Sequence, residues 1–234
     1  MKLTALICGL ALGTPGLTLP VNLTAATIFD NSKNDLLTRF NPGTAEVGDE
    51  LMLAGSERFL TNFSFEYWGT NTAGASAFAG AIEARVRFYR NDGAEFNGYA
   101  SPGSLLYDSQ WFFLGEPTER NTQLFEAGRD FPQEGLFLPV SELTWSVQFR
   151  GMGSTDLVGV DLYSPPTTGT AFPDYWEFEG AGWQLMTNSV PMDFASRFEA
   201  SLTSVPEPSA VALMTLVAVG CAGRRIRLGK RQRN

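Results

Sequence analysis

Alternation of apolar and polar side chains with a period of two is the feature that most constrains the fold of this chain. Successive side chains of a β-strand point to opposite faces, so this alternation is typical of a strand with one buried face. In one such stretch Ala84, Val86 and Phe88 form the apolar face. The same period runs through Phe59–Trp68, Glu83–Phe88, Leu143–Arg150, Val158–Tyr163 and Phe194–Leu202. No helical period persists beyond a turn or two, so the pattern predicts an all-β domain.

Turn residues separate these stretches and set the expected architecture. Clusters rich in Gly, Pro, Asn and Asp occur at 41–43, 91–93, 101–103, 151–153 and 164–166. Strands with one apolar face need a second sheet to cover that face. We therefore predict a two-sheet antiparallel β-sandwich of jelly-roll-like type. Within it, Leu105–Phe113 is apolar on both faces and is predicted to be a central strand, and the Ala/Gly-rich segment Thr70–Gly80 is predicted to be a loop.

Charge and residue content exclude several function classes. The chain has 25 acidic and 17 basic residues, and six of the basic residues lie in Arg224–Arg233, so the body is strongly acidic. An acidic body repels phosphate backbones, which argues against nucleic acid as a partner. Histidine is absent, which removes Ser-His-Asp and Cys-His catalysis. The two cysteines, Cys8 and Cys221, both lie in terminal apolar segments, so no disulfide is expected within the body.

The N-terminal segment has the grammar of a secretory signal peptide. Lys2 is followed by the apolar stretch Leu3–Leu12 and then by small residues at Thr24–Ala26. This order predicts a signal helix in 1–26 that is removed after Ala26. We therefore expect the protein to be exported, with a β-sandwich domain in 27–203.

The C-terminal segment, 204–234, has three parts in a fixed order. Pro206, Glu207 and Pro208 come first, followed by the uncharged run Ala210–Ala222 and then the basic cluster Arg224–Arg233. The apolar run predicts a short transmembrane helix, and the basic cluster favours a cytoplasmic C-terminus. The body would then lie outside the membrane, transiently anchored in the inner membrane by this helix.

This order of elements resembles the PEP-CTERM sorting domain, also called the ice-binding protein C-terminal domain. The resemblance implies recognition by an exosortase, a membrane transpeptidase, as the partner. It implies that Pro206, Glu207 and Pro208 are the recognition residues and that Arg224, Arg225 and Arg227 form the stop. It also implies export to the cell envelope, cell surface or extracellular space of a bacterium that makes extracellular polysaccharide. An ordinary single-pass anchor is the alternative, and it predicts a mature protein of full length.

In the stretches Ala84–Ala94, Leu105–Ser109 and Asp174–Leu185, the body is similar to the β-sandwich bodies that accompany this tail in other bacterial proteins. No enzymatic activity comes with this resemblance. The candidate ligand-binding residues of the body are Asp174, Tyr175, Trp176, Glu177 and Trp183. Aromatic rings beside polar groups can bind sugar rings by stacking and hydrogen bonding. The alternative is that the tryptophans close the end of the sandwich as core residues.

Three other sets of side chains were weighed as sites. Glu177 and Glu179 fall on one face of a strand, as the carboxyl pair of a glycoside hydrolase could. A structural calcium ion is an alternative at three aspartates in or near loops, although no metal site is assigned: Asp156, Asp161 and Asp174. Arg85 and Arg87 could meet an anionic ligand, but pairing with acidic residues of neighbouring strands is favoured.

The sequence thus predicts a non-enzymatic exported protein of the cell surface or extracellular matrix, associated with extracellular polysaccharide. No cofactor is expected. A lectin-like carbohydrate-binding module is the first alternative and a secreted glycoside hydrolase is the second.

Overall fold

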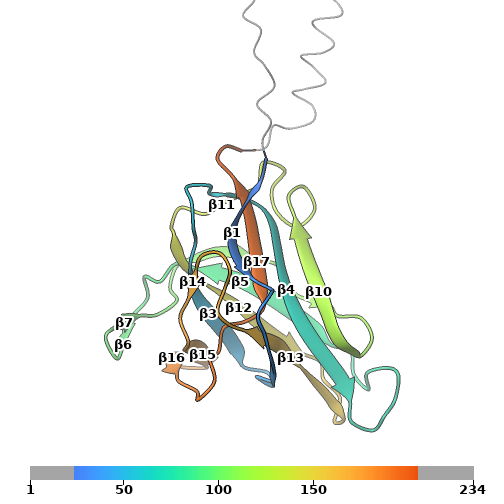
Figure 1. The fold of residues 1–234 in the computed structure, drawn as a ribbon. Coiled ribbons are helices and arrows are strands. Elements are labelled where there is room, and N and C mark those ends of the chain that lie inside the picture. The colour runs from blue at the N-terminus through green and yellow to red at the C-terminus, as the bar shows by residue number, and fades with distance from the viewer. Residues whose placement is uncertain (1–23, 205–234) are drawn as a thin grey trace, which may run out of the picture.

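The computed structural model describes residues 24–204, and its described part is all-β. Two antiparallel sheets pack face to face, with no helix among these residues (Figure 1). The predicted all-β, two-sheet antiparallel architecture is therefore confirmed. The signal helix, the C-terminal helix and the whole sorting signal lie outside the described residues.

The first sheet is built around β4 (Phe59–Asn71), its longest strand. Along one edge β4 pairs with β17 (Ser196–Ser201) and then with β13 (Asp156–Tyr163). Beyond these lie β1 (Ala26–Asn31), which pairs with β17, and β2 (Asp35–Phe40), which pairs with β13. Along its other edge β4 pairs with β10 (Thr118–Glu126) and β11 (Leu136–Phe137).

The second sheet has six strands in its main path and two short strands beside it. In spatial order the path is β16 (Gly182–Met186), β15 (Tyr175–Glu179), β3 (Glu46–Met52), β12 (Glu142–Arg150), β5 (Glu83–Tyr89) and β8 (Leu105–Asp108). The short strands are β14 (Thr170–Ala171), which pairs with β3, and β9 (Phe112–Phe113), which pairs with β5. A separate hairpin is formed by β6 (Glu95–Phe96) and β7 (Tyr99–Ala100).

Aromatic side chains from both sheets fill the space between them. The ring of Phe63 on β4 lies 4.7 Å from Phe198 in its own sheet, and 5.0 Å from Phe88 and 5.2 Å from Trp145 in the opposite sheet, measured between ring centroids. Such offset and edge-on contacts add to the free energy of burying the rings. Among the described residues, the buried core residues run from Ile28 to Ala200.

The predicted alternation is confirmed in most strands. Ala84, Val86 and Phe88 are fully buried, and so are the apolar residues of β12: Leu143, Trp145, Val147 and Phe149. An exception is Leu202, which follows β17 and is 62% exposed although the period assigns it to the core. The strand has already ended at Ser201, so the period no longer decides which side Leu202 faces.

The prediction of a central strand at Leu105–Phe113 is wrong. The stretch is split into β8 and β9, and both pair only with β5, so they form an edge of the second sheet. Gln110 adopts a left-handed φ of 58° in the break, which ends the regular pairing. Leu105 is 52% and Phe113 is 72% exposed, because one side of an edge strand has no neighbouring strand to cover it.

Candidate ligand-binding face

The predicted ligand-binding residues lie in the hairpin of β15 and β16, where strand alternation divides them between two faces. Tyr175 and Glu177 share a face with Val47, the register partner of Glu177, and Val47 is fully buried between the sheets. Trp176 pairs with Gly48 and therefore lies on the opposite face, which we call the outer face of the second sheet. Asp174 is half-buried in the segment before β15. The five residues thus do not form one platform.

Trp176 anchors the hairpin and offers no exposed ring. It is 0% exposed, and its indole Nε1 donates to Glu50 Oε2 at 2.9 Å. Its cross-strand partner Gly48 has no side chain, and a Cβ at that position would lie 2.6 Å from Cγ2 of Thr144. A sugar ring therefore cannot stack on Trp176, and its role is to position the hairpin.

Trp183 is the ring of the predicted set that is both partly exposed and on the outer face. It pairs with Phe178, whose ring lies edge-on at 5.3 Å, and Phe178 is 39% exposed. The ring of Tyr89, from β5, also meets Trp183 edge-on at 5.5 Å. The hairpin therefore closes over the outer face and brings three aromatic side chains together.

The buried carboxylate of Glu46 forms a hydrogen bond that holds Tyr89 of this aromatic group in place. Glu46 Oε1 accepts hydrogen bonds from Tyr89 Oη at 2.9 Å and Ser146 Oγ at 2.6 Å, and its other oxygen pairs with Arg87. Burial and the adjacent charge of Glu46 raise the pKa of Tyr89, so its hydroxyl stays protonated and fixed as a donor. Arg85 pairs in turn with Asp108. The favoured pairing of Arg85 and Arg87 with acidic residues of neighbouring strands is confirmed.

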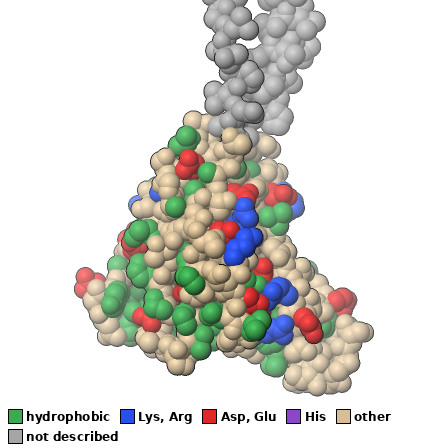
Figure 2. All heavy atoms as spheres, viewed as in Figure 1, with side chains coloured by type: hydrophobic (Ala, Val, Ile, Leu, Met, Phe, Trp, Pro, Cys, Tyr) green, Lys and Arg blue, Asp and Glu red, His purple; other side chains and the backbone are tan. Residues whose placement is uncertain are grey.

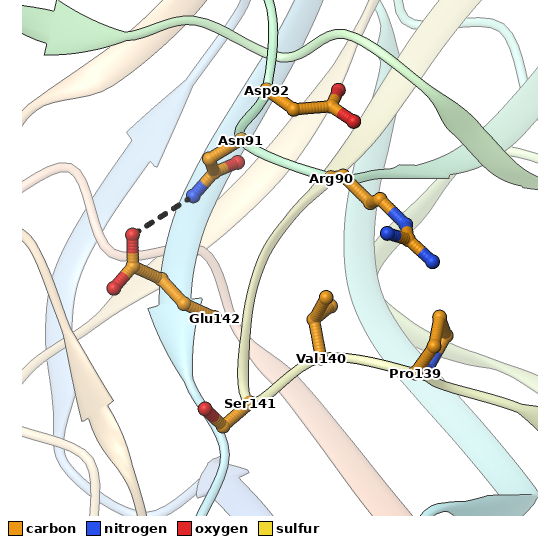
Figure 3. Close-up of a pocket in the computed structure, with 7 residues that line it drawn as sticks. All are labelled: Arg90, Asn91, Asp92, Pro139, Val140, Ser141 and Glu142. Carbon is orange, nitrogen blue, oxygen red and sulfur yellow. Dashed lines mark hydrogen bonds between the residues drawn. The ribbon is translucent and has the colours of Figure 1, made fainter.

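An open hollow of about 460 Å³ is formed by segments that include the residues following Tyr89 in the chain, and none of the three aromatic residues lines it (Figure 3). Thr144 connects the hollow to the aromatic group. It is the register partner of Tyr89, and its Oγ1 donates to Asn91 Oδ1 at 2.8 Å. Asn91 Nδ2 in turn lies 3.5 Å from Glu142 Oε1. The hollow is lined by the segments 90–92 and 139–142. We call Tyr89, Phe178, Trp183 and these lining residues the aromatic hollow.

The aromatic hollow carries both positively and negatively charged side chains. Figure 3 shows the guanidinium of Arg90 and the carboxylates of Asp92 and Glu142 around the opening. Burial raises the pKa of Glu50, and the nearby charge of Glu142 raises it further. Asp92 has a lowered pKa, because the backbone N–H of Ser104 donates to its Oδ1 at 2.6 Å. The arrangement can accept hydrogen bonds from hydroxyl groups at several carboxylate oxygens and donate from Arg90.

Sequence reasoning missed Asn91 and Glu142 as parts of this site, and it missed Glu50 as the partner of Trp176. β3 was not recognised as a strand, because Asp49 places a carboxylate on its inner face and disturbs the period. Asn91 belongs to a turn cluster that was assigned only a structural role. The polar outer positions of β12 were visible, but which neighbours they meet depends on strand order.

The other sequence candidates lie elsewhere. Glu177 Oε2 accepts a hydrogen bond from Tyr175 Oη at 3.2 Å, away from the aromatic hollow. The Asp156 carboxylate accepts three backbone N–H groups, from Ala79, Gly80 and Gly153. Asp161 lies within 4 Å of two arginine side chains of the first sheet. Within 24–204, no group of three or more His, Cys, Asp or Glu side chains is placed to hold a metal ion.

The predicted sorting residues cannot be placed. Pro206, Glu207, Pro208, Arg224, Arg225 and Arg227 all lie outside the described residues. Among residues 24–204 there is no helix of the length and apolarity needed to cross a membrane.

Comparisons with family models, curated proteins and solved structures found no match to this chain. The class that the described residues define is an all-β protein of two packed antiparallel sheets.

Proposed function

We propose that this chain is a non-enzymatic exported protein of the cell surface or extracellular matrix, sorted through its PEP-CTERM-like tail by an exosortase. Its jelly-roll-like body associates with extracellular polysaccharide. In the lectin-like alternative, the body itself is the module that binds the sugar. The observation that supports this alternative is the aromatic hollow: a partly exposed Trp183 meets Tyr89, and the residues that follow Tyr89 line an opening with hydrogen-bonding side chains.

The chemistry of the aromatic hollow suits a hydroxyl-rich ligand. Sugar rings present apolar C–H faces that pack on aromatic rings, and hydroxyls that exchange hydrogen bonds with carboxylates, amides and guanidinium groups. Trp183 and Phe178 supply the apolar surface, while Asn91, Glu142 and Arg90 supply the polar partners. Because Trp183 is held edge-on by Tyr89, it is already ordered before a ligand arrives.

Glycan-array binding with the purified full chain in a nonionic detergent tests the proposal. We expect binding to one or more polysaccharide fragments, and at least a tenfold loss of affinity in Trp183→Ala. Trp111→Ala is the matched control, because Trp111 is also half-buried but packs under Arg150, whose guanidinium lies 4.1 Å from its ring centroid. Absence of binding to every sugar, or an equal loss in both variants, contradicts binding through the aromatic hollow.

Hydrolysis is tested on the same fragments. The glycoside hydrolase alternative needs a catalytic carboxylate, and Glu177 is its sequence candidate. We expect no release of shorter sugars from any bound polysaccharide. If release is observed and is lost in Glu177→Gln, the non-enzymatic proposal is wrong.

A further inference from the structure

Two carboxylates are buried between the sheets with no basic partner among residues 24–204. Asp49 of β3 is 0% exposed, and Asp193, which precedes β17, is 3% exposed. The ion pairs of the described segment involve other acidic residues. Burying one unpaired carboxylate costs several kcal/mol in general, and placing a second one nearby adds repulsion. A bound cation or a proton is therefore needed to offset the negative charge of these side chains.

Several oxygen atoms around these carboxylates have no hydrogen-bond partner in the described structure. They are Oδ1 of Asp49, Oδ1 of Asp193, Oδ1 of Asn31 and Oγ of Ser196. All four residues are at least nine-tenths buried, at 0, 3, 1 and 2% exposure in that order. A buried polar atom without a partner is uncommon in native proteins, because its desolvation is not offset.

The same short backbone segment holds three of these side chains together. Asp49 Oδ2 accepts a hydrogen bond from the backbone N–H of Phe194 at 2.9 Å. Asn31 Nδ2 donates to the carbonyl oxygens of Tyr163 at 2.8 Å and Phe194 at 3.3 Å. Asp193 directly precedes Phe194, and its carbonyl accepts from Tyr163 N at 3.0 Å. Ser196 is the register partner of Asn31 on β17. The free oxygens therefore belong to residues that meet around the backbone of Asp193 and Phe194.

We propose that this cluster binds a calcium ion, with the carboxylates of Asp49 and Asp193 and the amide oxygen of Asn31 as ligands. Calcium takes carboxylate and amide oxygens in flexible geometry, and two carboxylates match its charge. Asp49 comes from the second sheet and Asn31 from the first, so the ion links the two sheets. This site differs from the three loop aspartates weighed from sequence, and it does not depend on the proposed sugar binding.

One further group bears on the occupant. The indole N–H of Trp145, cross-strand from Asp49, also has no partner. It can donate to one oxygen of Asp49 but supplies nothing to Asp193 or Asn31. Solvent and bound protons are therefore the competing occupants, and a single calcium ion neutralises both carboxylates at once.

Thermal unfolding of the full chain in a nonionic detergent, after EDTA treatment, tests the site. We expect the midpoint to rise with added CaCl2 and to saturate, and metal analysis after buffer exchange to find one calcium per chain. The same concentration of MgCl2 should shift the midpoint less, because Mg²⁺ demands stricter octahedral geometry and dehydrates reluctantly.

Two charge-removing variants and one control separate the occupants. Asp49→Asn and Asp193→Asn each keep the side-chain shape and remove one charge, so calcium affinity should fall at least tenfold. Either variant should be at least as stable as the original chain in EDTA and less stable than it in calcium. Asp161→Asn is the control, because Asp161 is equally buried but lies near Arg39 and Arg120; it should keep the full calcium response.

Three results overturn the proposal. One is an unfolding midpoint that does not change up to 10 mM calcium, with no calcium retained by the chain. Another is a calcium response that survives in both Asp49→Asn and Asp193→Asn. The third is an equal response in all variants including the control. Each of these results assigns the cluster to solvent and a bound proton.

Discussion

Replacement of Arg120 by methionine should destabilise the first sheet by removing the cation that joins β10 to its neighbours. Arg120 reaches from β10 to three carboxylates: Asp35 at 2.5 Å, Glu66 at 3.3 Å and Asp161 at 3.7 Å. Its guanidinium carbon also lies 5.3 Å from the ring centroid of Tyr163. Figure 2 shows basic and acidic side chains lying beside one another over this sheet. Methionine keeps an apolar stem and removes the guanidinium group, with its charge and its hydrogen bonds.

The expected magnitude follows from how much of each partner is exposed. The Arg120 side chain is 42% exposed, which favours the range of about 0.2–1 kcal/mol measured for surface pairs. The Asp161 side chain is only 2% exposed, and breaking a buried pair costs about 3–5 kcal/mol. Arg39 remains 3.5 Å from Asp161 and retains part of the attraction. We therefore expect a loss of about 2 kcal/mol at neutral pH, which for a domain of this size lowers the melting temperature by about 4–8 °C.

The destabilisation caused by Arg120→Met should depend on pH in a direction that follows from the pKa values of Asp35 and Asp161. For Asp35, burial raises the pKa but hydrogen bonds from Arg120 and Leu37 outweigh it, so its pKa is lowered. Stability from such a group is present above its unfolded pKa of about 3.9 and is lost as pH falls through the folded value. For Asp161, burial raises the pKa, and Arg120 and Arg39 offset this in part. Without Arg120 both pKa values rise, so the cost of Arg120→Met should shrink as the pH falls through these raised values and the carboxyls of the variant take up protons.

Urea unfolding at pH 7 and pH 4 measures both quantities. Arg129→Met is the control, because Arg129 also pairs with two carboxylates, Glu126 and Asp130, each at 2.8 Å, but its side chain is 55% exposed. Its loss should cost less than about 1 kcal/mol. If the two variants cost the same, or if the cost of Arg120→Met does not change with pH, the reasoning from burial is refuted.

Three further predictions concern a strand contact, a carboxyl pair and the tail. Gly159→Ala should destabilise the first sheet by more than about 2 kcal/mol, since its Cβ would overlap the carbonyl oxygen of Phe40; a urea midpoint equal to that of the original chain contradicts this. Glu50→Gln should stabilise the fold at pH 7, because burial and the charge of Glu142 raise the pKa of Glu50. The gain should vanish near pH 4, where the unfolded side chain also binds a proton, and a gain that grows toward low pH contradicts this reasoning. In the native host, mass spectrometry of the mature protein should show loss of the segment after the Pro206–Pro208 region, and a C-terminus at Asn234 contradicts processing.

The sequence determined the fold class because strand burial is encoded locally. Side chains two residues apart on β5 and β12 must face the same way, so Val86 and Val147 could be assigned to a buried face without knowing their partners. The same local rule failed for Leu105–Phe113, since an apolar strand can lie at an edge as well as at the centre. Position within a sheet depends on strand order, and the alternation of side chains carries no information about it.

Only the tertiary structure decided which residues share a site. The sequence proposed five neighbours in 174–183, but alternation along β15 places Trp176 and Glu177 on opposite faces. Trp183 instead meets Tyr89, a residue far away in the sequence, because the hairpin of β15 and β16 closes over the outer face. Likewise Asp49 is one acidic residue among many in the sequence, and only the packing of the two sheets places it beside Asp193 without a basic partner in the described segment. Contacts between distant segments come from sheet order and from the packing of one sheet on the other, which no local pattern records.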